Sequence, residues 1–148
     1  MTAITFGTFD NFHLGHLSYL TQAAKYCNHL IVVIARDQNV LVTKGKLPQQ
    51  NEEERLIAVE EKILKIAERI LSEAKAEPKD SEVIFNIKAV LGDVHNKFKI
   101  FQKYKIDLVC LGYDQEVDEA RLKEVFSGDI IRMKAFCPEK YKSSKIRD

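Results

Sequence analysis

The sequence predicts an α/β fold: a single Rossmann-like, doubly wound parallel sheet of about five strands with helices on both faces. Short apolar segments of strand length alternate with segments whose apolar residues recur at helical spacing. Strands separated by helices imply right-handed crossovers, and therefore a parallel sheet. The 148 residues are 45% hydrophobic, enough for one domain with a sizeable core, and we expect that domain to span residues 1–148.

The first part of the chain predicts two strands and one helix. Residues 3–6 (AITF) form a short apolar strand that ends at Gly7. Leucines at helical spacing from Leu14 onward predict the first helix. Residues 30–35 (LIVVIA) are continuously apolar, which is typical of a strand buried on both faces of a parallel sheet. The polar segment 36–50 is predicted to be a loop.

The alternation continues to the end of the chain. Asn51 and Glu54 have the spacing of a capping pair at the start of a long amphipathic helix, which ends at Pro78 at the latest. The remaining predicted strands are residues 83–91, 108–111 and 130–136, and the remaining predicted helices are residues 97–104 and 116–126.

Composition argues against several classes of protein. A formal net charge of +1 is unlike that of a general nucleic-acid binder, so no nucleic-acid partner is expected. The longest apolar run is too short to cross a bilayer and no signal-peptide pattern opens the chain, so no membrane partner is expected. Three scattered cysteines favour a reducing, cytoplasmic location without a disulfide framework or a structural zinc site.

Ligands of open parallel sheets bind beyond the carboxyl ends of the strands, which directs attention to Gly7 and Gly112. His13 and His16 follow Gly7, and three interpretations of this pair are open: structural hydrogen bonds, metal binding or anion stabilisation. A metal site needs further ligands, and the other histidines and cysteines offer no matching spacing. For an anion, Gly7 and Gly15 would allow close approach, helix amides would point at it, and two imidazoles could stabilise a phosphoryl-transfer transition state.

Two motifs in the right order carry a resemblance to a known family. Residues 7–10 (GTFD) followed by residues 13–16 (HLGH) resemble the signature of the cytidylyltransferase-like nucleotidyltransferases. Residues 143–147 (SSKIR) resemble that family's second signature. The resemblance covers most of the chain and implies transfer of a nucleoside monophosphate from a nucleoside triphosphate to a phosphorylated acceptor. Pyrophosphate would be released, and no covalent enzyme intermediate would form.

Matching positions transfer the family's roles onto this sequence. The resemblance implies a catalytic role for His13, His16 and Lys46, and acceptor binding by Lys44, Lys46 and Arg55. It implies nucleotide binding by Gly7, Thr8, Phe9, His13, Gly15, His16, Gly112, Asp114, Tyr141, Ser143, Ser144 and Arg147. Mg²⁺ is expected to be held through the nucleotide phosphates and water, without a metal site built from protein side chains.

The acceptor is indicated by other stretches. Residues 111–115 (LGYDQ) and 35–37 (ARD) are similar to the archaeal-type FAD synthases, which transfer AMP from ATP to FMN. The glycerol-3-phosphate cytidylyltransferases share the histidine motif, but usually carry Arg-Tyr-Val-Asp where residues 76–80 read AEPKD here. ATP and FMN are therefore the favoured substrates. CTP with a small phosphate acceptor and a non-catalytic nucleotide-binding domain are the alternatives. The resemblance also implies a homodimer.

Overall fold

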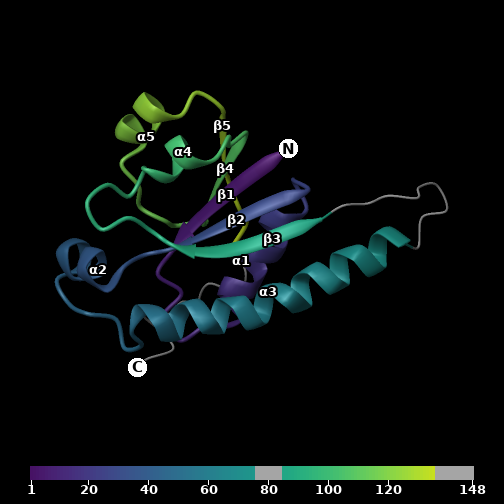
Figure 1. Cartoon of the computed structure of the whole chain (residues 1–148), viewed down its shortest axis with the longest axis horizontal. Helices are drawn as coiled ribbons and strands as arrows, with labels where there is room; N and C mark the ends of the chain where they lie inside the picture. The colour runs from purple at the N-terminus through teal and green to yellow at the C-terminus, as the bar shows by residue number, and fades with distance from the viewer. Residues whose placement is uncertain (76–84, 136–148) are drawn as a thin grey trace.

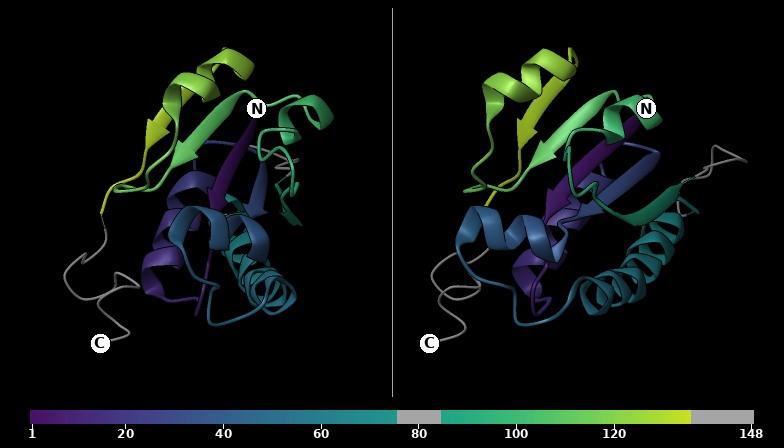
Figure 2. Two further views of the ribbon diagram at one scale, coloured as in Figure 1. Left: turned by 90° about the vertical axis from the view of Figure 1, so that its left-hand side faces the viewer. Right: turned by 60° about the vertical axis from the view of Figure 1, so that its left-hand side comes forward.

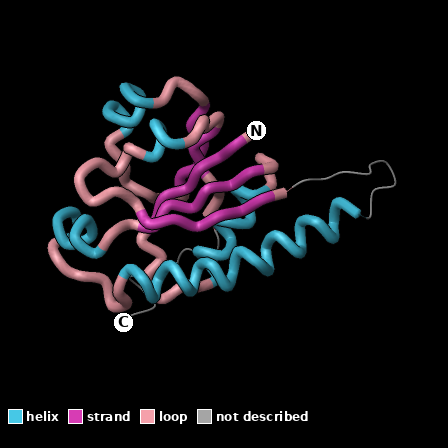
Figure 3. The backbone as a smooth tube through the Cα atoms, in the orientation of Figure 1, coloured by secondary structure: helices cyan, strands magenta, loops and turns pink. Residues whose placement is uncertain are grey.

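A computed structural model describes residues 1–75 and 85–135 (Figure 1). Its centre is a parallel sheet whose strands lie in the order β3-β2-β1-β4-β5 (Figure 3). The strands are β1 (Thr2–Gly7), β2 (His29–Ile34), β3 (Asn86–Leu91), β4 (Leu108–Leu111) and β5 (Asp129–Arg132). The predicted fold class is confirmed.

Helices cover both faces of this sheet (Figures 1 and 2). Side chains alternate along β1: Ala3 packs in the cluster beneath α1 (Leu14–Ala24) and α3 (Glu52–Lys75), whereas Ile4 packs in the opposite cluster. That second cluster includes residues of α5 (Glu119–Val125) and contacts Ile100 and Phe101 of α4 (Ile100–Lys103). Burial on both faces explains why residues 30–34 of β2 and the whole of β4 are apolar.

The prediction of a loop at residues 36–50 was wrong, because α2 (Asp37–Lys44) lies there. Only Val40 of this helix is buried, so it lacks the apolar periodicity that identified the others. Its end did carry a signal: Lys44 lies in the last turn, and Gly45 follows in the left-handed conformation (φ 79°) that favours glycine at a helix end. The predicted capping pair is confirmed, since Asn51 and Glu54 exchange two backbone-to-side-chain hydrogen bonds.

In the second half of the chain, β4 has the predicted bounds, whereas the other elements are shorter than predicted within the described residues. The third strand starts at Asn86, and α4 is one turn long. The fifth strand ends at Arg132, and α5 begins at Glu119 with Asp118 as its N-cap. Four predicted nucleotide-binding residues lie outside the described residues, namely Tyr141, Ser143, Ser144 and Arg147. Within residues 1–75 and 85–135, none of the helices is both long and apolar enough to cross a membrane.

The strand order reverses between β1 and β4, which are neighbours in the sheet although most of the described chain separates them in sequence. In open α/β sheets this reversal creates a crevice outside the carboxyl ends of the two strands. Gly7 ends β1 and Gly112 follows β4, so both predicted strand ends meet at this crevice. Figure 1 shows α2 and the start of α3 at the same edge of the sheet.

Candidate active site

The residues 7–16, called here the histidine turn, connect β1 to α1 around one buried aromatic ring. Phe9 and Asn11 both have left-handed backbone angles (φ 55° and 50°), which is unusual for a residue as bulky as phenylalanine. The Phe9 side chain is 2% exposed, and its ring packs against His16 and Tyr19 at centroid distances of 5.4 and 6.3 Å. Packing of this ring holds the turn in its sparsely populated conformation.

Glycine is required at position 7 because a side chain there would collide with the ring of Phe9, whereas the sequence had suggested close approach of a ligand. A Cβ atom at Gly7 would lie 2.7 Å from Cε2 of Phe9, which is closer than such atoms approach. The space that a side chain would take at this position is therefore occupied by the Phe9 ring. Gly7 contributes to the site by admitting that ring and thereby shaping the turn, and nucleotide binding by Gly7 stays a prediction.

His13 and His16 are oriented by a capping box at the start of α1. Nδ1 of His13 accepts a hydrogen bond from the Gly15 backbone N–H at 3.0 Å, and Nδ1 of His16 accepts one from the His13 backbone N–H at 3.2 Å. The two rings stack with centroids 3.8 Å apart. Because each Nδ1 accepts, each neutral ring carries its proton on Nε2 and can act as a hydrogen-bond donor there.

Both imidazoles are held in the neutral form. Burial lowers the pKa of His13. Burial, reinforced by His13 and Lys44 and opposed by Asp10, lowers the pKa of His16 to about 3. At neutral pH the pair therefore offers Nε2–H donors without a positive charge, next to the backbone amides at the start of a helix. This arrangement suits a phosphate oxygen on which negative charge increases during a reaction.

Polar contacts join the histidine turn to the segment between α2 and α3. The carboxylate of Asp10 is buried and accepts hydrogen bonds from the backbone N–H groups of Gln49 and Gln50, both at 2.9 Å. Nζ of Lys44 donates to Oγ1 of Thr8 at 3.2 Å. The structure thus brings Lys44 to the turn, and Lys46 lies exposed two residues further along the same segment.

Arg55 does not occupy the position of an acceptor ligand. Its side chain is fully buried, and the guanidinium donates to the carbonyl oxygens of Thr8, Ala35 and Gln50 at 2.8 to 3.1 Å. Nη2 also forms an ion pair with Oδ1 of Asp37 at 2.7 Å. With this set of partners and no exposed surface, Arg55 cannot contact an acceptor as placed. It holds the ends of β1 and β2 and the starts of α2 and α3 together.

Two further charged groups complete this structure, which we call the arginine network (Arg36, Asp37, Glu52 and Arg55). Glu52 accepts from the Asp37 backbone N–H at 2.9 Å and pairs with Arg36 at 2.6 Å, and these two contacts lower the pKa of Glu52. Nε of Arg36 donates to the Gly92 carbonyl oxygen at 2.8 Å, just beyond β3. The network therefore links the carboxyl ends of three neighbouring strands.

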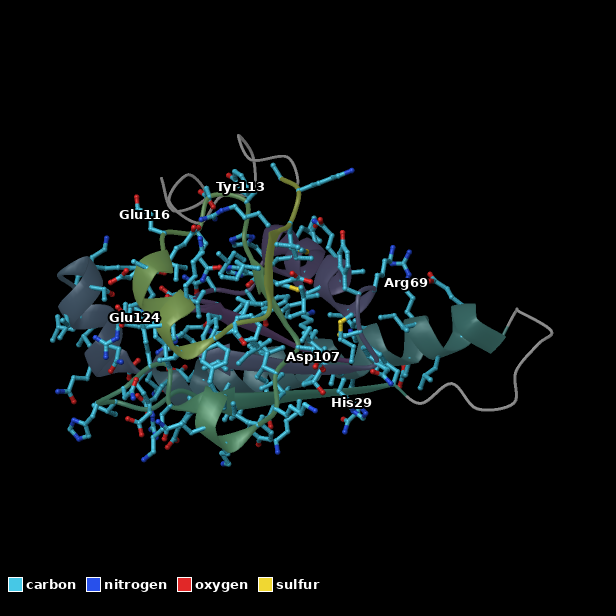
Figure 4. The ribbon with its side chains drawn as sticks, turned by 90° about the horizontal axis from the view of Figure 1, so that it is seen from above. His29, Arg69, Asp107, Tyr113, Glu116 and Glu124 are labelled. Atoms are coloured by element: carbon cyan, nitrogen blue, oxygen red, sulfur yellow. The ribbon has the colours of Figure 1, made fainter. Side chains whose placement is uncertain are left out.

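The loop after β4 closes the other side of the crevice. Oε1 of Gln115 accepts from the Gly112 N–H at 2.9 Å, and Nε2 of Gln115 donates to the Phe6 carbonyl oxygen at 2.8 Å. The buried hydroxyl of Tyr19 donates to the Cys110 carbonyl oxygen at 2.6 Å, and burial raises the pKa of Tyr19. Asp114 is exposed in the loop, as is the preceding residue, Tyr113, which is labelled in Figure 4. Sequence reasoning did not assign roles to Gln115 or Tyr19, although Gln115 lies within the quoted stretch LGYDQ.

Of the predicted site residues that the structure describes, none lies at the amino ends of the strands. His29 begins β2 and Asp107 precedes β4, so both lie at the amino ends of the strands (Figure 4). Asp107 accepts a hydrogen bond from the Thr2 backbone N–H at 2.8 Å, which fixes the start of β1. Among the residues that the structure describes, no group of three or more His, Cys, Asp or Glu is placed to hold a metal ion.

Comparison with known proteins agrees with this fold. Residues 4–148 match the model of the cytidylyltransferase-like family, and the chain belongs to that family. Its relatives include proteins named FAD synthase. The one from Archaeoglobus profundus is 36% identical over 80% of this chain and 61% of that protein. The one from Thermoplasma volcanium is 32% identical over 95% of this chain and 87% of that protein.

A solved structure shares the fold. The crystal structure of the lipopolysaccharide core biosynthesis protein from Thermoplasma volcanium superposes with a TM-score of 0.66. It is 28% identical in sequence, and the match covers 92% of this chain and 98% of that one.

Proposed function

We propose that this chain is an FMN adenylyltransferase, which forms FAD and pyrophosphate from ATP and FMN. The observation that carries the proposal is the pair of neutral, Nδ1-anchored histidines at the crevice between β1 and β4. The relatives named FAD synthase, together with the cytidylyltransferase-like family, support the choice of ATP and FMN.

In the proposed reaction, a phosphate oxygen of FMN attacks the α-phosphorus of ATP. A new P–O–P bond forms, and the bond to the β-phosphate breaks to release pyrophosphate. Negative charge accumulates on the α-phosphoryl oxygens during this step, so the Nε2–H groups of His13 and His16 would stabilise the transition state. Because the imidazoles are already neutral donors, they need no protonation change before the reaction.

Lys44 and Lys46 would neutralise phosphate charge on the acceptor side of the turn, since Lys44 already contacts Thr8. We propose Mg²⁺ as the cofactor, and the donor chemistry of the histidine turn is consistent with a cation that arrives with the triphosphate. N–H groups suit phosphate oxygens, whereas Mg²⁺ prefers oxygen ligands and retains water. When bound, the ion would reduce the negative charge of the phosphates.

The test is pyrophosphate release from ATP or CTP, each combined with FMN or glycerol 3-phosphate, in the presence of MgCl₂. We expect release with ATP and FMN, together with the appearance of FAD. Release only with CTP and glycerol 3-phosphate would replace this proposal with cytidylyl transfer. No release from any combination, combined with nucleotide binding, would indicate a non-catalytic domain.

We further propose that two copies associate through the outer face of α3. Ile57 and Leu64 are 55% and 66% exposed, and Leu71 is half-buried seven residues further on. Residues seven apart share a helix face, so the three form one apolar stripe. A two-fold axis at Leu64 would place Ile57 of one copy opposite Leu71 of the other. Figure 1 shows α3 extending beyond the start of β3.

Charge favours the antiparallel orientation of the two helices. The exposed charges on the first half of α3 are all acidic, and those on the second half are mixed: Glu53, Glu54, Glu60 and Glu61, then Lys65, Glu68, Arg69 and Glu73. We expect a dimer in size-exclusion chromatography with light scattering and a monomer for Leu64→Lys, which would oppose two ammonium groups at the axis. Val125→Lys changes an exposed residue of α5 instead of α3, and this variant should remain dimeric. A monomeric unsubstituted chain would overturn the dimer proposal.

A further inference from the structure

Two exposed apolar side chains lie at the edge of the candidate site, on either side of its lysines. Leu41 on α2 is 44% exposed, and Leu47 in the following segment is 59% exposed. We propose that Leu41 and Leu47 form the surface on which the planar ring system of the acceptor lies, while Lys44 and Lys46 bind its phosphate. This inference rests on the proposed function and names residues that recognise the flavin ring.

The direction of Leu41 follows from its neighbours on the helix. Asp37 and Lys44 lie four residues before and three residues after Leu41, so the three share one face of α2. Both flanking residues face the histidine turn: Asp37 pairs at 2.7 Å with Arg55, which also donates to the Thr8 carbonyl oxygen, and Lys44 donates to Oγ1 of Thr8 at 3.2 Å. Leu41 therefore faces the same region as these two residues, yet nearly half of its surface is uncovered.

Leu47 is held beside the same region by hydrogen bonds before and after it. The Gly45 N–H donates to the Leu41 carbonyl oxygen at 2.9 Å, which closes α2. The N–H groups of Gln49 and Gln50 donate to the buried carboxylate of Asp10 in the histidine turn. The segment that carries Leu47 must therefore pass from the end of α2 to the histidine turn. Single exposed leucines are common on protein surfaces, but this pair flanks a lysine that touches the phosphate-binding turn.

The combination of groups is suited to one class of acceptor. Two lysines provide positive charge for a phosphate, and two leucines provide apolar area for a flat aromatic ring. FMN has both parts, because a ribityl chain joins its phosphate to the isoalloxazine ring. A polyol phosphate has no group that would gain from contact with leucine, so this surface favours a flavin acceptor over glycerol 3-phosphate.

The experiment compares Leu41→Ser and Leu47→Ser with Val42→Ser. Val42 is the matched control, because it is 78% exposed on the same helix but points about 100° around the helix axis from Leu41. We expect each leucine substitution to raise KM for FMN about fivefold, while kcat and KM for ATP stay within twofold. Val42→Ser should leave all three constants unchanged. With ribitol 5-phosphate, which lacks the ring, the leucine variants should react like the unsubstituted chain.

Each other outcome has a distinct meaning. If both leucine variants keep KM for FMN within twofold, the inference is wrong although the proposed function stands. If Val42→Ser raises KM equally, or if the leucine variants are equally impaired with ribitol 5-phosphate, the ring is not recognised by this surface. If the unsubstituted chain makes no FAD from ATP and FMN, the proposed function fails first, and the inference falls with it.

Discussion

The histidine turn and the arginine network lie at the same edge of the sheet, but they differ in whether a buried ionisable side chain keeps its charge. The arginine network keeps a full charge in the interior by surrounding it: Arg55 has three carbonyl oxygens and one carboxylate as partners. The histidine turn instead removes the charge, since burial lowers the pKa of both imidazoles. Only the histidine turn leaves a donor, the Nε2–H of each imidazole, that the fold orients but does not use for its own hydrogen bonds at Nδ1. That donor is suited to a role in the reaction.

Because of this difference, substitutions in the two regions are expected to affect different properties: stability in the arginine network and activity in the histidine turn. Loss of Arg55 would leave its partners without a donor in the interior, so the main consequence is expected in folding. If another acceptor takes the place of Nδ1 of His16, the hydrogen bond from the His13 backbone N–H is kept and only the Nε2–H donor is lost. The main consequence is then expected in the reaction. Variants of the two regions should therefore fail in different assays.

The largest expected effect on stability is that of Arg55→Met. Removing one partner of a buried charged pair typically costs about 3–5 kcal/mol, because the remaining groups stay buried without compensation. Urea unfolding should show this loss, and Arg55→Lys should recover only part of it, since one ammonium cannot reach all four acceptors. Arg69→Met is the control: Arg69 forms an exposed ion pair with Glu73, and its loss should cost less than about 1 kcal/mol.

A different result for Arg55→Met would restore the role that the resemblance implied. If this variant unfolds at the same urea concentration as the unsubstituted chain but has a raised KM for FMN, Arg55 acts on the acceptor and the arginine network is not its main role.

For the histidine turn, the informative substitution is His16→Asn. The asparagine side-chain oxygen can replace Nδ1 as the acceptor for the His13 N–H, but no atom replaces the Nε2–H donor. We expect kcat for FAD formation to fall roughly 10²–10³-fold, the usual result of losing one preorganised donor to a transition state. The free energy of unfolding should change by less than about 1 kcal/mol. His95→Asn, at an exposed loop residue, should keep full activity. An equal loss of stability in His16→Asn would mean that the ring is structural.

The sequence could predict those features of the two regions that depend on residues close together in the chain. The strands and the Asn51–Glu54 cap depend on residues within a few positions of one another, and these predictions agree with the structure. The role of the histidine pair stays a prediction, although the structure places both residues at the start of α1. The family motif added the choice of chemistry, because two histidines alone left three interpretations open.

The arginine network could not be read in the same way. The partners of Arg55 are backbone carbonyl oxygens at residues 8, 35 and 50, which only the folded sheet brings together. An arginine near the start of a helix, beside a phosphate motif, therefore resembles a ligand in sequence. The packing of the Phe9 ring into the side-chain space of Gly7 was not predicted either, because it depends on the unusual backbone angle of Phe9.

The pH dependence of stability gives a sharper and smaller test of the histidine turn. His16 has a pKa of about 3 in the folded chain and about 6.5 when unfolded, so between these values the unfolded chain binds the extra proton. The contribution of neutral His16 is complete above pH 6.5 and is lost as the pH falls toward 3. Between pH 7 and 5.5 we expect the free energy of unfolding to fall by about 1 kcal/mol more in the unsubstituted chain than in His16→Asn. Keeping the pH above 5 limits the contribution of carboxylates. Equal pH slopes would contradict the burial of this imidazole.

The smallest expected effect concerns a buried polar group that belongs neither to the histidine turn nor to the arginine network. Thr5 lies in β1 just before the histidine turn, is fully buried, and within the described residues its hydroxyl has no hydrogen-bond partner. Thr5→Val keeps the shape and removes the unsatisfied group, so we expect unfolding to require about 1 kcal/mol more and FAD formation to be unchanged. Thr43→Val, which removes an exposed hydroxyl bonded to the Asn39 carbonyl oxygen, should shift stability by no more than about 0.5 kcal/mol. If Thr5→Val instead lowers kcat without lowering stability, the hydroxyl takes part in the reaction, and the functional region extends from the turn into the central strand.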